Sequence, residues 1–309
     1  MTISPVGGFP SKAVAFIAAA PPGGGWHVTC EAVVQALRQE HLLHVGVEMV
    51  TTPGGLRVLE ETVSGRRGDG HTLVAFSPGL TLQILLRGSR YTYDDITPIA
   101  ALSTDYGVLV VPAASPIKNL DDLITRLRAS PQDLPVTGGS GPGAMHHGMI
   151  GVVARAAGLA PGDVRYVGAE GVAPAVRGLR EGYTPLGAMG AADILEEAKT
   201  GAVRVLAVLA EERLPGVLED VPTAIEQGLN VSFPMWRGFY AGPDVEPVAV
   251  EFWSDIFSRL HGTPSWQRLL TEKGWFPFLR LGERFRSFLQ EDTARYVSAL
   301  GRREASGAA

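Results

Sequence analysis

Short apolar runs alternate with longer stretches of helical periodicity along the first third of the chain. Apolar residues that recur every three or four positions predict amphipathic helices, and compact apolar runs predict buried strands. The pattern predicts strands at 13–19, 46–50, 72–76 and 108–111, with helices at 28–39 and 80–86. Pro112 ends the last of these strands, because proline has no N–H to donate to a strand ladder. Such an alternation is typical of βαβ units.

A second alternation begins after Asn119. Asp121 and Asp122 fall in the first turn of a predicted helix and Arg128 in its last, as the helix dipole favours. The pattern then predicts strands at 135–137, 164–167 and 203–210 and helices at 149–157 and 173–180. Three helical stretches follow at 248–260, 265–273 and 282–300, with no clear strand between them. We expect this last segment to return to the first α/β unit.

Composition narrows the class of protein. A chain of 309 residues with 45% hydrophobic side chains can form two lobes, and a net charge of -5 argues against a nucleic-acid partner. No run approaches the roughly 20 apolar residues of a membrane span. Residues 1–10 lack the pattern of a secretory signal. The single cysteine, Cys30, excludes an internal disulfide, and we expect it to be buried.

The most informative local sequence is PPGGGWH at 21–27, which follows the first predicted strand and opens the first helix. Glycines expose backbone N–H groups, and a helix N-terminus turns such donors into a site for carboxylate or phosphate. A plain flexible turn is the alternative. No Gly-Lys-Ser or Gly-Lys-Thr follows, which argues against nucleotide binding. We predict ligand contacts at Gly24, Gly25, Trp26 and His27.

A similar segment, TGGSGPGAMHH, occupies 137–147, again between a predicted strand and a helix. Tandem histidines are about as often plain loop residues as ligands. A metal site is disfavoured because no third ligand is evident, and His41 and His44 are interpreted as surface residues. We predict neither metal nor cofactor here, and ligand contacts at Gly139, Ser140, Gly143, His146 and His147.

Two further polar residues have competing interpretations. Ser77 lies in AFSPG, which resembles a degraded nucleophile elbow, but Pro78 cannot supply the N–H that an oxyanion needs. Ser77 is better interpreted as a helix cap or as a hydroxyl donor to a ligand. Asp105 precedes the strand at 108–111 and either orients loop donors or is a solvated turn residue.

The order and spacing of these motifs resemble those of the tripartite tricarboxylate transporter substrate-binding family, also called Bug receptors. Each piece alone is weak, but many occur in one order over nearly the whole chain. They are FPSK at 9–12, PGGGW at 22–26, PGG at 53–55, GDGHTL at 68–73, TPIA at 97–100, SPIKNL at 115–120, the loop ending at His147, DVPT at 220–223, EQG at 226–228 and WRG at 236–238.

The resemblance implies a type II periplasmic-binding-protein fold, with two α/β lobes and a ligand cleft between them. Lobe 1 would comprise 1–108 and 237–309 and lobe 2 would comprise 109–236, with hinge crossings near 108–111 and 233–240. It also implies that backbone N–H groups and waters of the two loops hold carboxylates. This chain has Trp26-His27 where many relatives have Trp-Asp, and His146-His147 where they often have Asp-His. Fold therefore transfers more readily than ligand identity.

Our leading hypothesis is a monomeric periplasmic receptor, not an enzyme, that captures a small organic carboxylate for the membrane subunits of a tripartite transporter. Its predicted contacts are completed by Ser77, Asp105, Gly168 and Met189. The alternatives are an α/β hydrolase-like enzyme that uses Ser77 and a binding lobe repurposed as a sensor.

Overall fold

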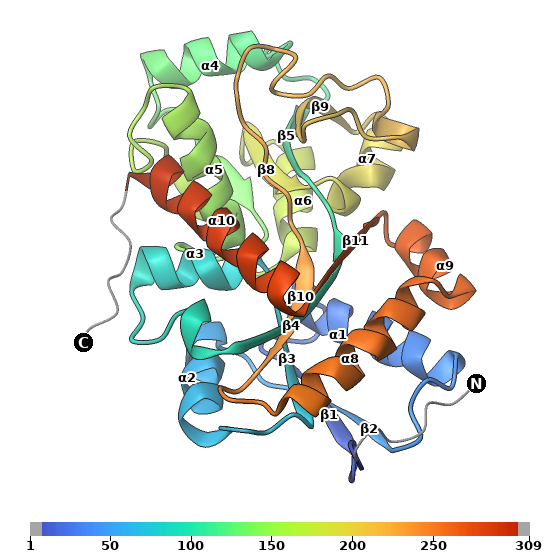
Figure 1. Cartoon of the computed structure of the whole chain (residues 1–309). Coiled ribbons are helices and arrows are strands. Elements are labelled where there is room, and N and C mark those ends of the chain that lie inside the picture. Colours follow the sequence, from blue (N-terminus) through green and yellow to red (C-terminus); the bar gives the residue numbers. More distant parts are fainter. Residues whose placement is uncertain (1–7, 302–309) are drawn as a thin grey trace. The chain divides into compact units, whose positions relative to one another are not determined.

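The computed structural model describes residues 8–301 and divides them into two compact units (Figure 1). Unit 1 holds residues 8–104 and 236–294, and unit 2 holds 105–235 and 295–301. The last helix, α10 (Gly282–Leu300), contributes residues to both units, whereas the family resemblance predicts that all of 237–309 belong to one lobe. Its end belongs to unit 2 because Tyr296 packs on Phe233, with ring centroids 5.6 Å apart. That the crossings act as hinges stays a prediction.

The described part of unit 1 forms a six-stranded sheet in the order β11-β4-β10-β3-β1-β2. Strands β1, β2 and β3 are parallel, and β10 runs antiparallel to both β3 and β4. The strand bounds are β1 Val14–Ala18, β2 Val47–Thr51, β3 Thr72–Phe76, β4 Thr97–Thr104, β10 Arg237–Ala241 and β11 Phe276–Leu281.

Both faces are covered at the inner strands of this sheet, which explains why β1 and β3 are continuous apolar runs rather than alternating ones. Phe16 of β1 packs edge-on against Trp253, with centroids 5.8 Å apart. The next residue, Ile17, points to the other face and joins a cluster that includes Phe76 and Trp236. The helices of unit 1 are α1 Gly25–Gln39, α2 Gly55–Gly65, α3 Pro78–Arg87, η1 Tyr93–Asp95, α8 Pro247–His261, α9 Pro264–Glu272 and most of α10.

Within its described residues, unit 2 forms a five-stranded sheet in the order β7-β6-β8-β5-β9. Strands β6, β7 and β8 are parallel, and β5 runs antiparallel to β8 and β9. Its strands are β5 Gly107–Pro112, β6 Val136–Gly138, β7 Tyr166–Gly168, β8 Leu186–Gly190 and β9 Val203–Leu209. Its helices are α4 Leu120–Ala129, α5 Met145–Ala156, α6 Val172–Arg180, η2 Ala192–Ile194, α7 Leu195–Lys199 and η3 Gly216–Leu218.

The two sheets share one strand order. In each, the first parallel strand (β1 or β6) lies between the second and the third, and the third pairs with an antiparallel strand, β10 or β5. Helix α1 follows β1, and helix α5 follows β6. The N-termini of these helices therefore occupy equivalent places, at the carboxyl ends of the central parallel strands, where ligands of open α/β sheets bind.

The α/β class and the two-unit organisation emerge as the sequence pattern predicts, but several elements were missed: helices α2 and α7 and strands β4, β8, β10 and β11. The prediction of no strand between the last helices was wrong, because β11 pairs antiparallel with β4. Pro277 obscures the strand signal, and proline is tolerated because β11 lies at the edge of the sheet. Cys30 is fully buried, as predicted, and burial raises the pKa of its thiol to about 12.

Candidate functional site

Residues 21–27, called the α1 loop here, form a tight turn that leads into α1. Gly24 N–H donates to the Pro21 carbonyl at 2.9 Å, and Gly23 between them has φ 78°. Proline at the second position and a positive φ at the third define a type II turn, which explains Pro22-Gly23. The turn delivers the chain to Gly24, the N-cap of α1.

The N-terminus of α1 is built to attract an anion. Gly24 has extended dihedrals and, having no side chain, leaves the first-turn N–H groups without a side-chain cap. The first turn also contains no acidic residue, and Gly25 is exposed. Uncapped N–H donors together with the positive end of the helix dipole favour a bound carboxylate.

Trp26 is fixed beside this turn by two contacts. Its indole Nε1–H donates to Ser77 Oγ at 2.9 Å, and its ring covers Gly55, where a Cβ would approach to 2.7 Å. Ser77 also caps α3, since its Oγ accepts from Gly79 N–H at 3.3 Å, so the cap interpretation is confirmed. A hydroxyl that accepts two hydrogen bonds still carries one donor, so the interpretation of Ser77 as a ligand donor remains open.

His27 turns its Nδ1 toward its own loop. Gly23 N–H donates to Nδ1 at 3.3 Å, and the Glu31 carboxylate lies 3.2 Å from the same atom. The first contact needs an Nδ1 without a hydrogen and the second an Nδ1 that carries one, so the two cannot be hydrogen bonds at the same time. Ligand contact by His27 stays a prediction.

Residues 141–147, called the α5 loop here, repeat this design in unit 2. Ala144 N–H donates to the Gly141 carbonyl at 3.2 Å, and Gly143, after Pro142, has φ 75°. Gly143 N–H donates to His147 Nδ1 at 2.8 Å, as Gly23 N–H does to His27. The two loops are thus the same type II turn with the same glycine-to-histidine hydrogen bond.

The α5 loop differs in that the hydroxyl of the residue before it, Ser140, accepts a hydrogen bond from one of its backbone N–H groups. Ser140 Oγ accepts from His146 N–H at 3.0 Å, whereas Ala20 precedes the α1 loop. Tyr166 donates its hydroxyl to the Ser140 carbonyl at 2.6 Å and stacks on His147, with centroids 4.8 Å apart. Burial lowers the pKa of His147 and raises that of Tyr166. Tyr166 was not among the predicted site residues.

The predicted glycines of unit 2 permit close packing. A Cβ on Gly139 would lie 2.7 Å from the backbone of Val172, and a Cβ on Gly168 would lie 2.6 Å from the Ser140 carbonyl. Met189 is fully buried in β8. Ligand contacts by these residues stay predictions, and their observed contacts are internal to unit 2.

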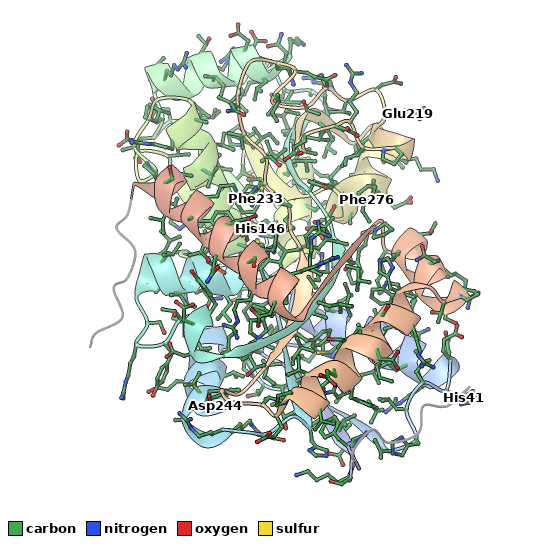
Figure 2. All side chains as sticks on the ribbon, in the orientation of Figure 1. His41, His146, Glu219, Phe233, Asp244 and Phe276 are labelled. Atoms are coloured by element: carbon green, nitrogen blue, oxygen red, sulfur yellow. The ribbon has the colours of Figure 1, made fainter. Side chains whose placement is uncertain are left out.

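Asp105 is fully buried and is therefore not a solvated turn residue. Its carboxylate accepts from Tyr106 N–H at 2.7 Å and from Ala192 N–H at 3.2 Å, and so it holds the segment after β8. Nearby, Asp193 lies 4.0 Å from Nε2 of His146, which Figure 2 labels. Acidic groups therefore gather at this edge of unit 2.

Unit 1 places a cation at the equivalent edge. Because β10 runs antiparallel to β3, Gly238 lies opposite Phe76, the last residue of β3, and Arg237 stands at the edge where the helices begin. Its Nη1 is 3.5 Å from the place of a Cβ on Gly25. Sequence reasoning recognised Arg237 only as part of a motif, because its place depends on strand pairing.

The described residues were also searched for a metal-binding group and for a membrane-spanning helix. Among residues 8–301, no group of three or more His, Cys, Asp or Glu side chains is arranged to hold a metal ion. Over the same span, no helix has the length and apolar character needed to cross a membrane. His41 and His44 are both exposed, as predicted.

Two curated proteins resemble the chain in sequence. A Pseudomonas sp. (strain P51) protein, described as a UPF0065 protein in the tcbD-tcbE intergenic region, is 26% identical over 79% of this chain and 72% of its own length. Bordetella pertussis BugT is 22% identical over 94% of this chain and 89% of its own.

Solved structures show the same fold. MatC from Rhodopseudomonas palustris with bound malate has a TM-score of 0.79 at 22% identity, covering 94% of this chain and 100% of that one. R. palustris Rpa4515 with adipate has a TM-score of 0.78 at 22% identity, covering 95% and 98%.

A family-wide sequence model gives the assignment. The model described as "Tripartite tricarboxylate transporter family receptor" matches residues 35–303, most of the chain. The resemblance carried by the sequence motifs is thereby confirmed. The chain belongs to the tripartite tricarboxylate transporter receptor family, a family of solute-binding proteins.

Proposed function

We propose that this protein is a periplasmic receptor that binds a small organic carboxylate, with the α1 loop of unit 1 as the candidate anion site. The observation that carries the proposal is the uncapped N-terminus of α1, which offers backbone N–H donors and a helix dipole to an anion. The α5 loop repeats this turn within unit 2.

Two structural relatives support the ligand class, since one holds malate and the other adipate. Their identity to this chain is too low to transfer the ligand itself. We further propose that the receptor is monomeric and delivers its ligand to the membrane subunits of a tripartite transporter. The family description, which names a receptor of the tripartite tricarboxylate transporter family, supports the second part of this proposal.

Catalysis by Ser77 is the weaker alternative. Ser77 Oγ accepts hydrogen bonds from Trp26 and Gly79. The residue after Ser77 is Pro78, which has no backbone N–H to donate to an oxyanion. The environment suits a structural hydroxyl better than an activated nucleophile, which needs an adjacent base.

The test is a thermal-shift screen of mono-, di- and tricarboxylates, malate and adipate among them, followed by calorimetry of each hit. A ligand at about 100 times its Kd should stabilise the protein by about 2.7 kcal/mol. The bound ligand should then be recovered chemically unchanged. Failure of every carboxylate to bind, or conversion of a hit into product, would contradict the proposal.

A further inference from the structure

We propose that His27 couples carboxylate binding at the α1 loop to the uptake of a proton, and that Glu31 sets the pH range in which this happens. His27 is thus a positioning residue, which acts through the charge and the N–H donors of the loop. The inference rests on the proposed function and adds a regulation of the same site: affinity for a carboxylate rises as pH falls.

The first observation is that two partners compete for one ring nitrogen. Gly23 N–H donates to His27 Nδ1 at 3.3 Å, and the Glu31 carboxylate lies 3.2 Å from the same atom. A neutral ring with its hydrogen on Nε2 accepts from Gly23. A protonated ring donates from Nδ1 to Glu31 instead, and the Gly23 N–H is then available to another acceptor.

The second observation is the place of the ring in the helix. His27 is the third residue of α1, whose first turn contains no acidic residue. A positive charge in the first turn is disfavoured by the helix dipole, and a bound anion offsets that cost. Anion binding therefore favours the protonated ring, and by reciprocity protonation of the ring strengthens anion binding.

The charged groups described around the α1 loop agree with this sign. Arg237 of β10 already brings a positive charge to the start of α1. Glu31 is exposed, so its attraction for the imidazolium is weak, and Arg57 of the neighbouring α2 pairs with Glu61. Without an anion, protonation of His27 adds a second cation at the positive end of a helix. A bound carboxylate relieves this repulsion.

The third observation is the contrast with the α5 loop. The ring of His147 also accepts a glycine N–H, but Gly151 stands four residues later, where α1 has Glu31. The ring stacks on Tyr166, and burial lowers the pKa of His147. Its surroundings in unit 2 therefore favour the neutral ring, whereas the α1 loop provides an acidic partner for the protonated one.

The experiment is calorimetry of a carboxylate from the screen, malate in the first instance, in buffers of different ionisation enthalpy, which counts the protons taken up on binding. At about pH 7 the unmodified protein should take up a fraction of a proton per ligand. Its affinity should be about two- to tenfold higher at about pH 6.5 than at about pH 8, a range in which ordinary carboxyl groups stay ionised. His27→Gln should remove both the uptake and the pH dependence.

Two glutamate variants test the role of Glu31. Glu31→Gln keeps the ring but removes its anionic partner, so the pH range in which affinity changes should move lower and proton uptake at about pH 7 should fall. Because Glu31 is exposed, this variant decides the matter if His27→Gln fails to fold. Glu60→Gln is the matched control, since it removes the same charge from an exposed position of α2 and should leave proton uptake and affinity unchanged.

The outcomes are distinguishable. If no carboxylate binds the unmodified protein, the proposed function fails and this inference fails with it. If a carboxylate binds without proton uptake, or if His27→Gln takes up as much as the unmodified protein, the proposed function stands and only the inference is overturned. If Glu31→Gln leaves the pH range where it was, Glu31 does not set it, and that part of the inference is overturned.

Discussion

The α1 loop and the α5 loop have the same backbone conformation, but the charged side chains around them are of opposite sign. Both are type II turns in which a glycine N–H donates to a histidine Nδ1 four residues later. Around the α1 loop stand an uncapped helix and Arg237, whereas around the α5 loop stand the Ser140 hydroxyl and the acidic Asp105 and Asp193.

The difference shows that the fold repeats the backbone of the loops but not the charge around them. The shared strand order places a helix N-terminus at the same point of each sheet, which supplies donors twice. Side chains outside the loops then set the charge at each point. The same backbone design thus stands in two different electrostatic environments.

The largest expected effect is on stability, at a glycine of unit 2 that lies close to the backbone of a neighbouring helix. Gly139→Ala places a Cβ 2.7 Å from the backbone of Val172, while the equivalent position in unit 1 is already Ala19. Backbone cannot yield as a side chain does, so we expect a loss of about 1–3 kcal/mol in the free energy of unfolding. Denaturant titration measures it.

Gly162→Ala is the control for this exchange, because a Cβ there meets nothing within 4 Å. It should leave stability unchanged or slightly higher. Equal stability of the Gly139 variant and the unmodified protein would show that α6 can shift, and the close approach would then not define the α5 loop.

A smaller effect is expected from the hydroxyl that supports the α1 loop. Ser77→Ala removes the cap of α3 and the acceptor of the Trp26 indole, at a cost of about 0.5–2 kcal/mol in stability. Ligand affinity should fall as well, because Trp26 loses its anchor. Thr263→Ala removes a cap of the same kind from α9 and should lower stability alone. Unchanged affinity in the Ser77 variant would show that the hydrogen bond from Trp26 to Ser77 does not contribute to ligand binding.

The hydroxyl of Ser140 can be introduced at the equivalent position of unit 1. Ala20→Ser places a hydroxyl there, where it can accept from the backbone N–H of Trp26 as Ser140 accepts from the backbone N–H of His146. The ligand would then compete with an internal acceptor, so we expect carboxylate affinity to fall by up to about tenfold. Calorimetry with the tightest dicarboxylate measures it, and an unchanged Kd would mean that the ligand does not use this N–H.

The smallest effect concerns pH. Burial holds the pKa of His147 below its ordinary value, so the folded protein binds this proton less readily than the unfolded chain does. Stability should therefore fall as pH drops below the ordinary histidine pKa, about 6.5. His147→Gln should make thermal unfolding less dependent on pH between about 7.5 and 5.5. If thermal unfolding of the His147 variant depends on pH as steeply as that of the unmodified protein, the pH dependence comes from other groups.

The sequence predicted what depends on neighbours along the chain. Buried strands such as β1 and β3 were recognisable as apolar runs, and the α1 and α5 loops as Pro-Gly turns that open helices. The cap at Ser77 follows from the same local chemistry, since Pro78 is favoured at the first helical position.

Contacts made through sheet pairing could not be predicted in this way. Arg237 reaches the α1 loop because β10 runs antiparallel to β3, and Tyr166 reaches Ser140 because β7 pairs with β6. Strand β11 was missed for a related reason, since its pairing with β4 overrides the unfavourable proline. Such residues are identified by register, which local periodicity does not reveal.

The central claim is that backbone N–H groups at the start of α1 hold the carboxylate. Nuclear magnetic resonance of the 15N-labelled protein, titrated with a dicarboxylate that calorimetry shows to bind, tests it most directly. The account predicts that the amide resonances of Gly25 and Trp26 shift downfield in proportion to saturation, as expected for N–H groups that gain a charged acceptor. A saturating ligand that leaves these amides unmoved would contradict it.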